Sequence, residues 1–196
     1  MLSARLKEET KAAHQSLEKA MVVYIRKVQT EEQYVRLLQL FYGFYRPLEE
    51  RIARYVDDSI MPEFNSRAKT GRLLNDMDNG AADDNILAVD LPVIESLAAA
   101  LGAMYVLEGS TLGGEYIAKM LASQSGIKDS RLSFFNSYGN KRMEMWAGFI
   151  ETINSYGNDS NISRQVVDSA SQTFLKFKSW LIAFYTPVEA AVLPFR

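Results

Sequence analysis

The chain has 196 residues, 47% of them hydrophobic, with a formal net charge of −2 and no cysteine. This size and composition favour one globular domain, and the small net charge gives no reason to expect nucleic acid or an anionic membrane as a partner. The lack of cysteine excludes disulfides, thiolate metal sites, iron–sulfur clusters and a cysteine nucleophile. No apolar run approaches the ~20 residues of a membrane span, and the N-terminus does not resemble a signal peptide, so we expect a cytoplasmic protein.

Nearly every periodic segment has the helical period. In chain order the sequence predicts a first helix over 2–17, a long helix over 31–56 and a short helix over 66–77, followed by a loop over 76–90. A glycine-containing helix then begins at about 90 and is followed by a turn region over 123–131. The remaining elements are a helix over 142–153, a break over 154–163 and a last helix over 164–184. No strand pattern and no internal repeat is evident. The prediction is an all-α helical bundle forming one domain over 1–196, with its core at about 2–185 and a short C-terminal tail.

Polar residues and prolines mark three of these boundaries. Thr30 and Gln33 have the spacing of a capping box, which opens the long helix. Pro47 is expected to kink or break that helix, since proline has no N–H to donate. Asp90 and Pro92 are suitable cap and first-turn residues, so the glycine-containing helix is expected to begin there.

A glycine cluster interrupts the pattern of that helix. Gly109, Gly113 and Gly114 follow each other closely, with Gly102 one heptad earlier. Each glycine in a helix interior costs roughly 0.5–1 kcal/mol relative to alanine. A helix keeps such residues where a ligand or another backbone must come close, or where it bends. We expect a kinked helix that contacts a ligand, and a ligand-free helix crossing is the alternative.

His14 is the only histidine in the chain and lies at the edge of the first apolar stripe. Lys11 precedes it by about one turn and Lys7 by two turns, on the same flank. Seven residues of helix span about 10.5 Å, comparable to the reach from a porphyrin iron to its carboxylates. Imidazole can ligate haem iron and ammonium groups can pair with propionates. The alternative is a surface histidine beside a solvated, charge-balanced face.

Other chemistries fit these residues poorly. Ser110 does not stand in the G-x-S-x-G elbow of a serine hydrolase. A carboxylate-bridged diiron site requires glutamate three residues before histidine, where this chain has Lys11. A single histidine without cysteine provides too few nitrogen and sulfur ligands for zinc.

Four segments together resemble the haem oxygenase family, in its bacterial, biliverdin-forming type. They are Leu6-Lys7-x-x-x-Lys11-x-x-His14, the stretch YVLEGSTLGG over 105–114, Phe134-Phe135-x-x-Tyr138-Gly139 with Trp146-x-x-Phe149, and Ala170-x-x-Thr173-Phe174 with Trp180-Leu181. The resemblance extends from about residue 2 to 185. The glycine block together with the upstream K-x-x-x-K-x-x-H is its most specific part.

The resemblance implies an enzyme that cleaves haem at a meso carbon to biliverdin, carbon monoxide and ferrous iron. Haem would be both cofactor and substrate, O2 the co-substrate, and an external ferredoxin or reductase the electron donor. A haem or tetrapyrrole-binding protein of the same fold without turnover is the alternative. A helical enzyme of the thiaminase type is a weaker one, because its usual nucleophile is cysteine.

The resemblance also implies roles for individual residues. His14 is the expected proximal iron ligand, and Ser110 stands where animal enzymes have an aspartate that organises distal water. The expected catalytic positions are Gly109, Ser110 and Gly113. The expected haem-binding positions are Lys7, Lys11, His14, Tyr105, Gly109, Gly113, Gly114, Arg142 and Phe174. At 141–143 the chain lacks the Thr-Gly of many relatives, so propionate contacts from this helix would fall to Arg142 or Lys141.

Overall fold

The computed structural model describes residues 1–77 and 82–186. Its α-helices are α1 (Leu2–Glu9), α2 (Lys11–Ile25), α3 (Glu31–Ile52), α4 (Phe64–Arg67), α5 (Thr70–Asp76), α6 (Leu97–Ser125), α7 (Arg142–Ser155) and α8 (Ser160–Tyr185), with short 3-10 helices η1 (Asp129–Arg131) and η2 (Gly139–Lys141). Within these described ranges there is no strand, as the all-α prediction requires. The last part of the predicted C-terminal tail and residues 78–81 of the predicted 76–90 loop lie outside the described residues.

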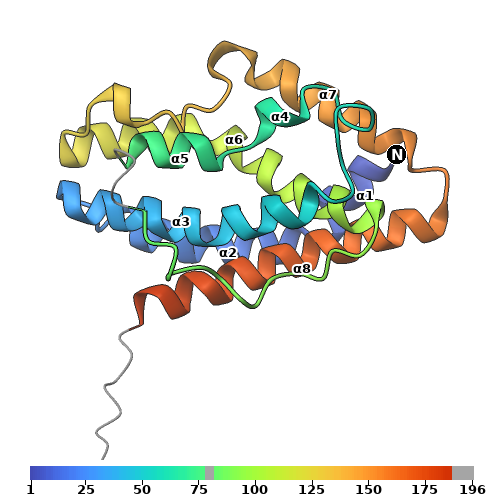
Figure 1. Cartoon of the computed structure of the whole chain (residues 1–196), viewed down its shortest axis with the longest axis horizontal. Helices are drawn as coiled ribbons and strands as arrows, with labels where there is room; N and C mark the ends of the chain where they lie inside the picture. The colour runs from blue at the N-terminus through green and yellow to red at the C-terminus, as the bar shows by residue number, and fades with distance from the viewer. Residues whose placement is uncertain (78–81, 187–196) are drawn as a thin grey trace, which may run out of the picture.

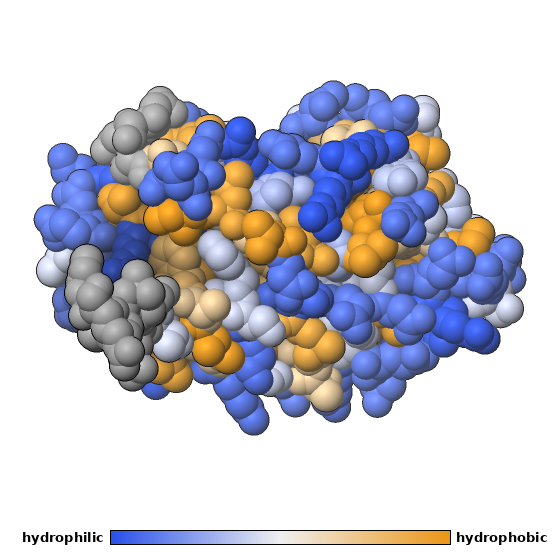
Figure 2. All heavy atoms as spheres, turned by 60° about the horizontal axis from the view of Figure 1, so that its bottom comes forward, coloured by the Kyte–Doolittle hydropathy of each residue, from blue (hydrophilic) through white to orange (hydrophobic). Residues whose placement is uncertain are grey.

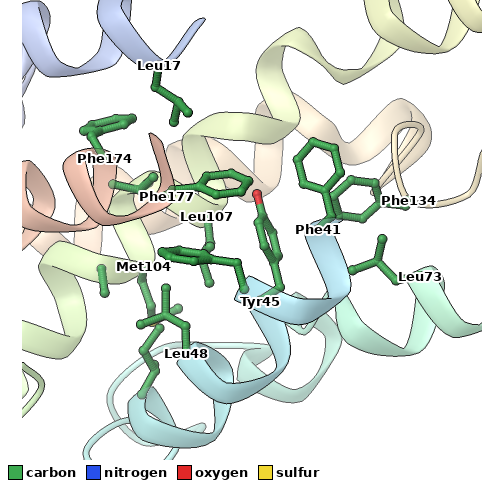
Figure 3. Close-up of a cluster of buried hydrophobic side chains, with 14 of the residues drawn as sticks. Leu17, Phe41, Tyr45, Leu48, Leu73, Met104, Leu107, Phe134, Phe174 and Phe177 are labelled. Atoms are coloured by element: carbon green, nitrogen blue, oxygen red, sulfur yellow. The ribbon is translucent and has the colours of Figure 1, made fainter. Parts of the chain in front are cut away.

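Helix α8 is the element that joins the others. It packs against α1, α2, α3 and α6, while α3 packs against α5 and α6 (Figure 1). At the centre, the Phe177 ring of α8 stacks on Phe44 with centroids 4.6 Å apart and meets Phe41 edge-on at 5.6 Å. Figure 3 shows this aromatic cluster with Tyr45 and Phe134 beside it. The core therefore lies where α3, α6 and α8 meet.

Two predicted helices are each divided in two. The first is interrupted at Thr10, whose hydroxyl donates to the Leu6 carbonyl at 2.7 Å, and α2 then continues to Ile25. The short helix predicted over 66–77 is divided because the Glu49 carboxylate accepts from the backbone N–H of Lys69 at 2.6 Å and of Thr70 at 3.2 Å. A side chain of α3 thereby satisfies the open N–H groups at the start of α5.

The start of α3 confirms the predicted capping box, but the break expected at Pro47 does not occur. The Thr30 hydroxyl accepts from Gln33 N–H, and the Gln33 side chain accepts from Thr30 N–H. Pro47 cannot donate to the Gly43 carbonyl four residues earlier. That carbonyl instead accepts from the backbone N–H of Ala88 at 2.8 Å. A distant loop thus replaces the lost helical hydrogen bond, and α3 continues to Ile52.

The predicted start of α6 at Asp90 and Pro92 is wrong. The N-cap is Ser96, whose hydroxyl accepts from Ala99 N–H at 3.1 Å. Asp90 instead forms an ion pair with Lys176 of α8, and the segment before α6 runs along that helix without helical structure (Figure 1). The last helix also begins earlier than predicted, at Ser160, because Asp159 caps it.

Helix α6 continues through all its glycines and bends in its middle part (Figure 1). It ends at Gly126, whose φ of 66° is the left-handed conformation that glycine adopts readily. None of the helices in the described ranges is long and apolar enough to span a membrane. On the face that carries α8, hydrophobic patches are separated by hydrophilic ones (Figure 2).

Candidate functional site

His14 lies in the first turn of α2, with its side chain at the surface. The ring packs on the buried Phe174 of α8, with ring centroids 5.3 Å apart and planes inclined by 43°. Among the described residues the imidazole has no side-chain hydrogen bond. Phe174 therefore supports the ring from one side and leaves its nitrogens available to an external partner.

Tyr105 joins α6 to the junction of α1 and α2. It is half-buried and interacts with the Thr10 side chain, and its ring lies 5.7 Å from that of Trp146 in α7. Burial raises the pKa of Tyr105, although the interaction with Thr10 acts in the opposite direction. His14 follows Thr10 by four residues, and Gly109 follows Tyr105 by four. His14 and Gly109 thus lie one helical turn beyond the same interhelical contact.

Gly109 and Gly113 leave the backbone of α6 open to the surface. A Cβ built on Gly113 would meet no atom within 4 Å, and one on Gly109 would meet only the Trp146 ring, at 3.8 Å. Leu112 and Tyr116 share this side of the helix at i+3 and i+4 spacing and are 41% and 71% exposed. The open stripe of α6, residues 109, 112, 113 and 116, offers bare backbone and apolar surface to a flat ligand.

Gly102 and Gly114, unlike Gly109 and Gly113, pack closely against the backbone of other segments. A Cβ on Gly114 would lie 2.1 Å from the Phe135 carbonyl oxygen, and one on Gly102 would lie 2.3 Å from the Val166 carbonyl oxygen. Both residues are buried. Close backbone packing within the protein accounts for these two glycines, so Gly114 contacts the 134–138 segment on the protein side of α6.

Ser110 stands at the edge of the open stripe and is tied to the core. Its hydroxyl donates to the Leu107 carbonyl at 2.7 Å and accepts from the Tyr45 hydroxyl at 3.1 Å. Figure 3 shows the Tyr45 oxygen pointing toward α6. Burial raises the pKa of Tyr45, so its phenol stays protonated and remains the donor to Ser110.

Of the three cationic residues predicted for the site, only Arg142 forms an ion pair with a described residue. Lys7 and Lys11 are exposed, and neither ammonium forms an ion pair with a described residue. Arg142 is engaged, because its Nη1 lies 2.9 Å from the Glu115 carboxylate of α6. Lys119 and Arg142 together lower the pKa of Glu115 to about 2.

A buried charge cluster next to this region was not found by sequence analysis. The Glu108 carboxylate lies 2.7 Å from Arg67 Nη1 and 2.7 Å from Lys69 Nζ, and it accepts from the Tyr138 hydroxyl at 2.7 Å. Burial lowers the pKa of Lys69. In the sequence, Glu108 stands out only as a lone carboxylate in an apolar stretch of helix. Its partners Lys69 and Arg67 lie 39 and 41 positions earlier in the chain, so no local pattern connects them to it. We call these four residues the Glu108 cluster.

Taken together, the residues fit a flat, partly charged ligand such as haem. An accessible imidazole lies on α2 and a bare helix backbone on α6, each one turn beyond the Thr10–Tyr105 contact. Two ammonium groups without an ion-pair partner among the described residues precede the imidazole and would be available to carboxylates. An imidazole on one helix and bare backbone on another are elements that a flat ligand held between two helices would need.

Comparison with known proteins identifies the family of this chain. A sequence profile of the family described as "Heme oxygenase" matches residues 1–183. The fold is similar to that of the NO- and CO-bound heme oxygenase from Neisseria meningitidis, with a TM-score of 0.77 and 21% identity over 97% of this chain and 95% of that one. It is also similar to heme oxygenase from Leptospira interrogans, with a TM-score of 0.73 and 17% identity over 92% and 98% of the two chains.

No curated protein sequence matches the chain significantly. The profile match nevertheless covers most of its length, and the protein belongs to the haem oxygenase family. The all-α fold is that of the solved family members.

Proposed function

We propose that this protein is a haem oxygenase that cleaves haem at a meso carbon, releasing biliverdin, carbon monoxide and ferrous iron. The observation that carries the proposal is the position of His14 and Gly109, each one turn beyond the Thr10–Tyr105 contact. Family membership and fold support haem oxygenase activity in general. The product, an external ferredoxin or reductase as electron donor, and a cytoplasmic location are parts of the proposal.

On the α2 side, His14 would hold the iron through a ring nitrogen. Its contact with Phe174 limits rotation of the imidazole and excludes water from one of its faces. Neutral imidazole is a weaker electron donor than thiolate, so it does not favour early O–O bond cleavage. Bound haem supplies the iron that activates O2 and the carbon that is oxidised.

On the α6 side, Gly109 and Gly113 would let bare helix backbone contact the bound ring. No aspartate, glutamate, lysine, arginine or histidine occurs in the open stripe itself, so no side chain there can act as a strong acid beside the iron. Ser110, oriented by Tyr45 and the Leu107 carbonyl, would hold water at its hydroxyl. Water held there would be available as the proton source, and the backbone of the open stripe would limit the space beside the bound ring.

The carboxylates of haem need cationic partners, and Lys7 and Lys11 are the unpaired ones. Tyr105 already interacts with Thr10, and Arg142 already pairs with Glu115. We therefore assign the first carboxylate contacts to the two lysines. Arg142 would contribute only by leaving Glu115.

The test is turnover of the haem-reconstituted protein with ascorbate, O2 and catalase, the last to remove free peroxide. We expect the Soret band to disappear and chromatography to identify a biliverdin isomer. His14→Ala should abolish turnover while retaining part of the haem affinity, and Gln15→Ala, an exposed neighbour on α2, should behave as wild type.

Two results would contradict the proposal. A Soret band that persists with ascorbate, O2 and added ferredoxin and reductase would favour a haem carrier of this fold. Wild-type turnover by His14→Ala without added imidazole would show that His14 does not bind the iron.

A further inference from the structure

A hollow lies between the C-terminal end of α3, α4 and α6. Its volume is about 320 Å³, and apolar side chains line much of it. They are Ile52 and Ala53 from the end of α3, Phe64 from α4, and Met104 and Leu107 from α6. We call it the α3–α6 cavity.

This cavity is separate from the candidate haem site. At 100° per residue, Met104 lies roughly 130° and Leu107 roughly 170° around α6 from the centre of the open stripe. Both side chains are buried, and Figure 3 shows them among the core residues near Leu48 of α3. A molecule in the cavity would thus contact α6 from behind the proposed haem face.

The carboxylates that line the cavity already have partners. Glu49 accepts from the start of α5, including the Thr70 hydroxyl at 2.6 Å, and Glu50 pairs with Arg46 at 3.3 Å. Glu108 is held within the Glu108 cluster, which also engages the lining residue Arg67. An ionic ligand would lose its hydration without finding an unpaired carboxylate. The lining therefore favours a neutral molecule.

The size and flexibility of the walls suit a small ring compound. A volume of 320 Å³ lies at the lower end of small-molecule sites, which span about 300–1,000 Å³. Ala53 and Ala68 leave room at the wall, and the thioether chain of Met104 can adapt to different shapes. We propose that the α3–α6 cavity is a second ligand site for a neutral, largely apolar molecule of one or two aromatic rings.

Indole is a suitable probe, because it is neutral, apolar and of this size. We would titrate it calorimetrically into the haem-saturated protein, in which haem fills its own site, and into the protein without haem. The expected result is one indole per chain at the cavity in both forms. Ala53→Trp should fill the cavity and weaken indole binding at least tenfold.

The matched control is Ala183→Trp, which places the same side chain at an exposed alanine of α8 away from the cavity. It should bind indole as wild type does. If Ala53→Trp does not fold by circular dichroism, Ala68→Trp fills the cavity from α4 and carries the same expectation.

Three outcomes would overturn the proposal. The first is no indole binding by the wild type up to the solubility limit. The second is undiminished binding by the folded cavity-filling variant. The third is binding only without haem, which would place indole at the proposed haem site.

Discussion

Helix α6 uses the same residue type for two purposes along its length. At Gly102 and Gly114 a carbonyl oxygen of another segment occupies the space that a Cβ would need, at 2.3 and 2.1 Å. At Gly113 the same construction finds open space, and at Gly109 only an ordinary contact with Trp146. Packing within the protein explains Gly102 and Gly114. Gly109 and Gly113 have no such explanation, which is why we place a ligand there.

The largest expected effect comes from packing within the protein, in the Glu108 cluster. Glu108→Ala leaves Arg67 and Lys69 buried without their shared counter-ion, and removing one partner of a buried ion pair costs about 3–5 kcal/mol. Urea unfolding should show this loss in the free energy of unfolding. Glu115→Ala, an exposed ion-paired residue of the same helix, is the control and should change little. Equal effects of the two substitutions would show that the cluster is not a stabilising element.

A smaller effect separates the two glycine environments directly. Gly114→Ala forces a Cβ against the Phe135 backbone and should destabilise the protein by about 1–3 kcal/mol. Gly113→Ala meets nothing and should stabilise the haem-free protein by about 0.5–1 kcal/mol through helix propensity. Thermal or urea unfolding of both variants measures the difference. The comparison of open and closed glycines fails if the two substitutions shift stability in the same direction by similar amounts.

The smallest effect concerns ionisation near the open stripe. The pKa of Glu115 is lowered from 4.5 to about 2, first by Lys119 and then by Arg142. Because the folded-state pKa is the lower one, its stabilising contribution is complete above pH 4.5 and is lost as the pH falls toward 2. Lys119→Met and Arg142→Met should both raise this pKa, the first more than the second, in an NMR titration of the carboxyl. An unmoved pKa in Arg142→Met would show that Arg142 is not held by Glu115.

The local features of the fold could be predicted from the sequence, and those that depend on distant partners could not. The capping box at Thr30 is complete within four residues, so its prediction is confirmed. Continuation of α3 through Pro47 depends on Ala88, a partner from a distant loop that no local pattern announces. The start of α6 at Ser96 was missed because Asp90 is an equally good cap in sequence but pairs with Lys176.

The same distinction applies to the candidate site. The glycine block and the spacing of Lys7, Lys11 and His14 are visible in the sequence, and the family assignment is confirmed. Which glycines are open depends on where Phe135 and Val166 pack, so the sequence could not separate Gly114 from Gly113.

The most direct test of the central claim, that haem binds on the open stripe, is a haem titration followed at the Soret band. Gly113→Leu should weaken haem binding at least tenfold with an undiminished free energy of unfolding, because its side chain would occupy the ligand's place. Gly71→Leu is the matched control, since Gly71 in α5 also meets no atom within 4 Å but lies outside the candidate site. It should bind haem as wild type does. Equal haem dissociation constants for Gly113→Leu and wild type would contradict the account.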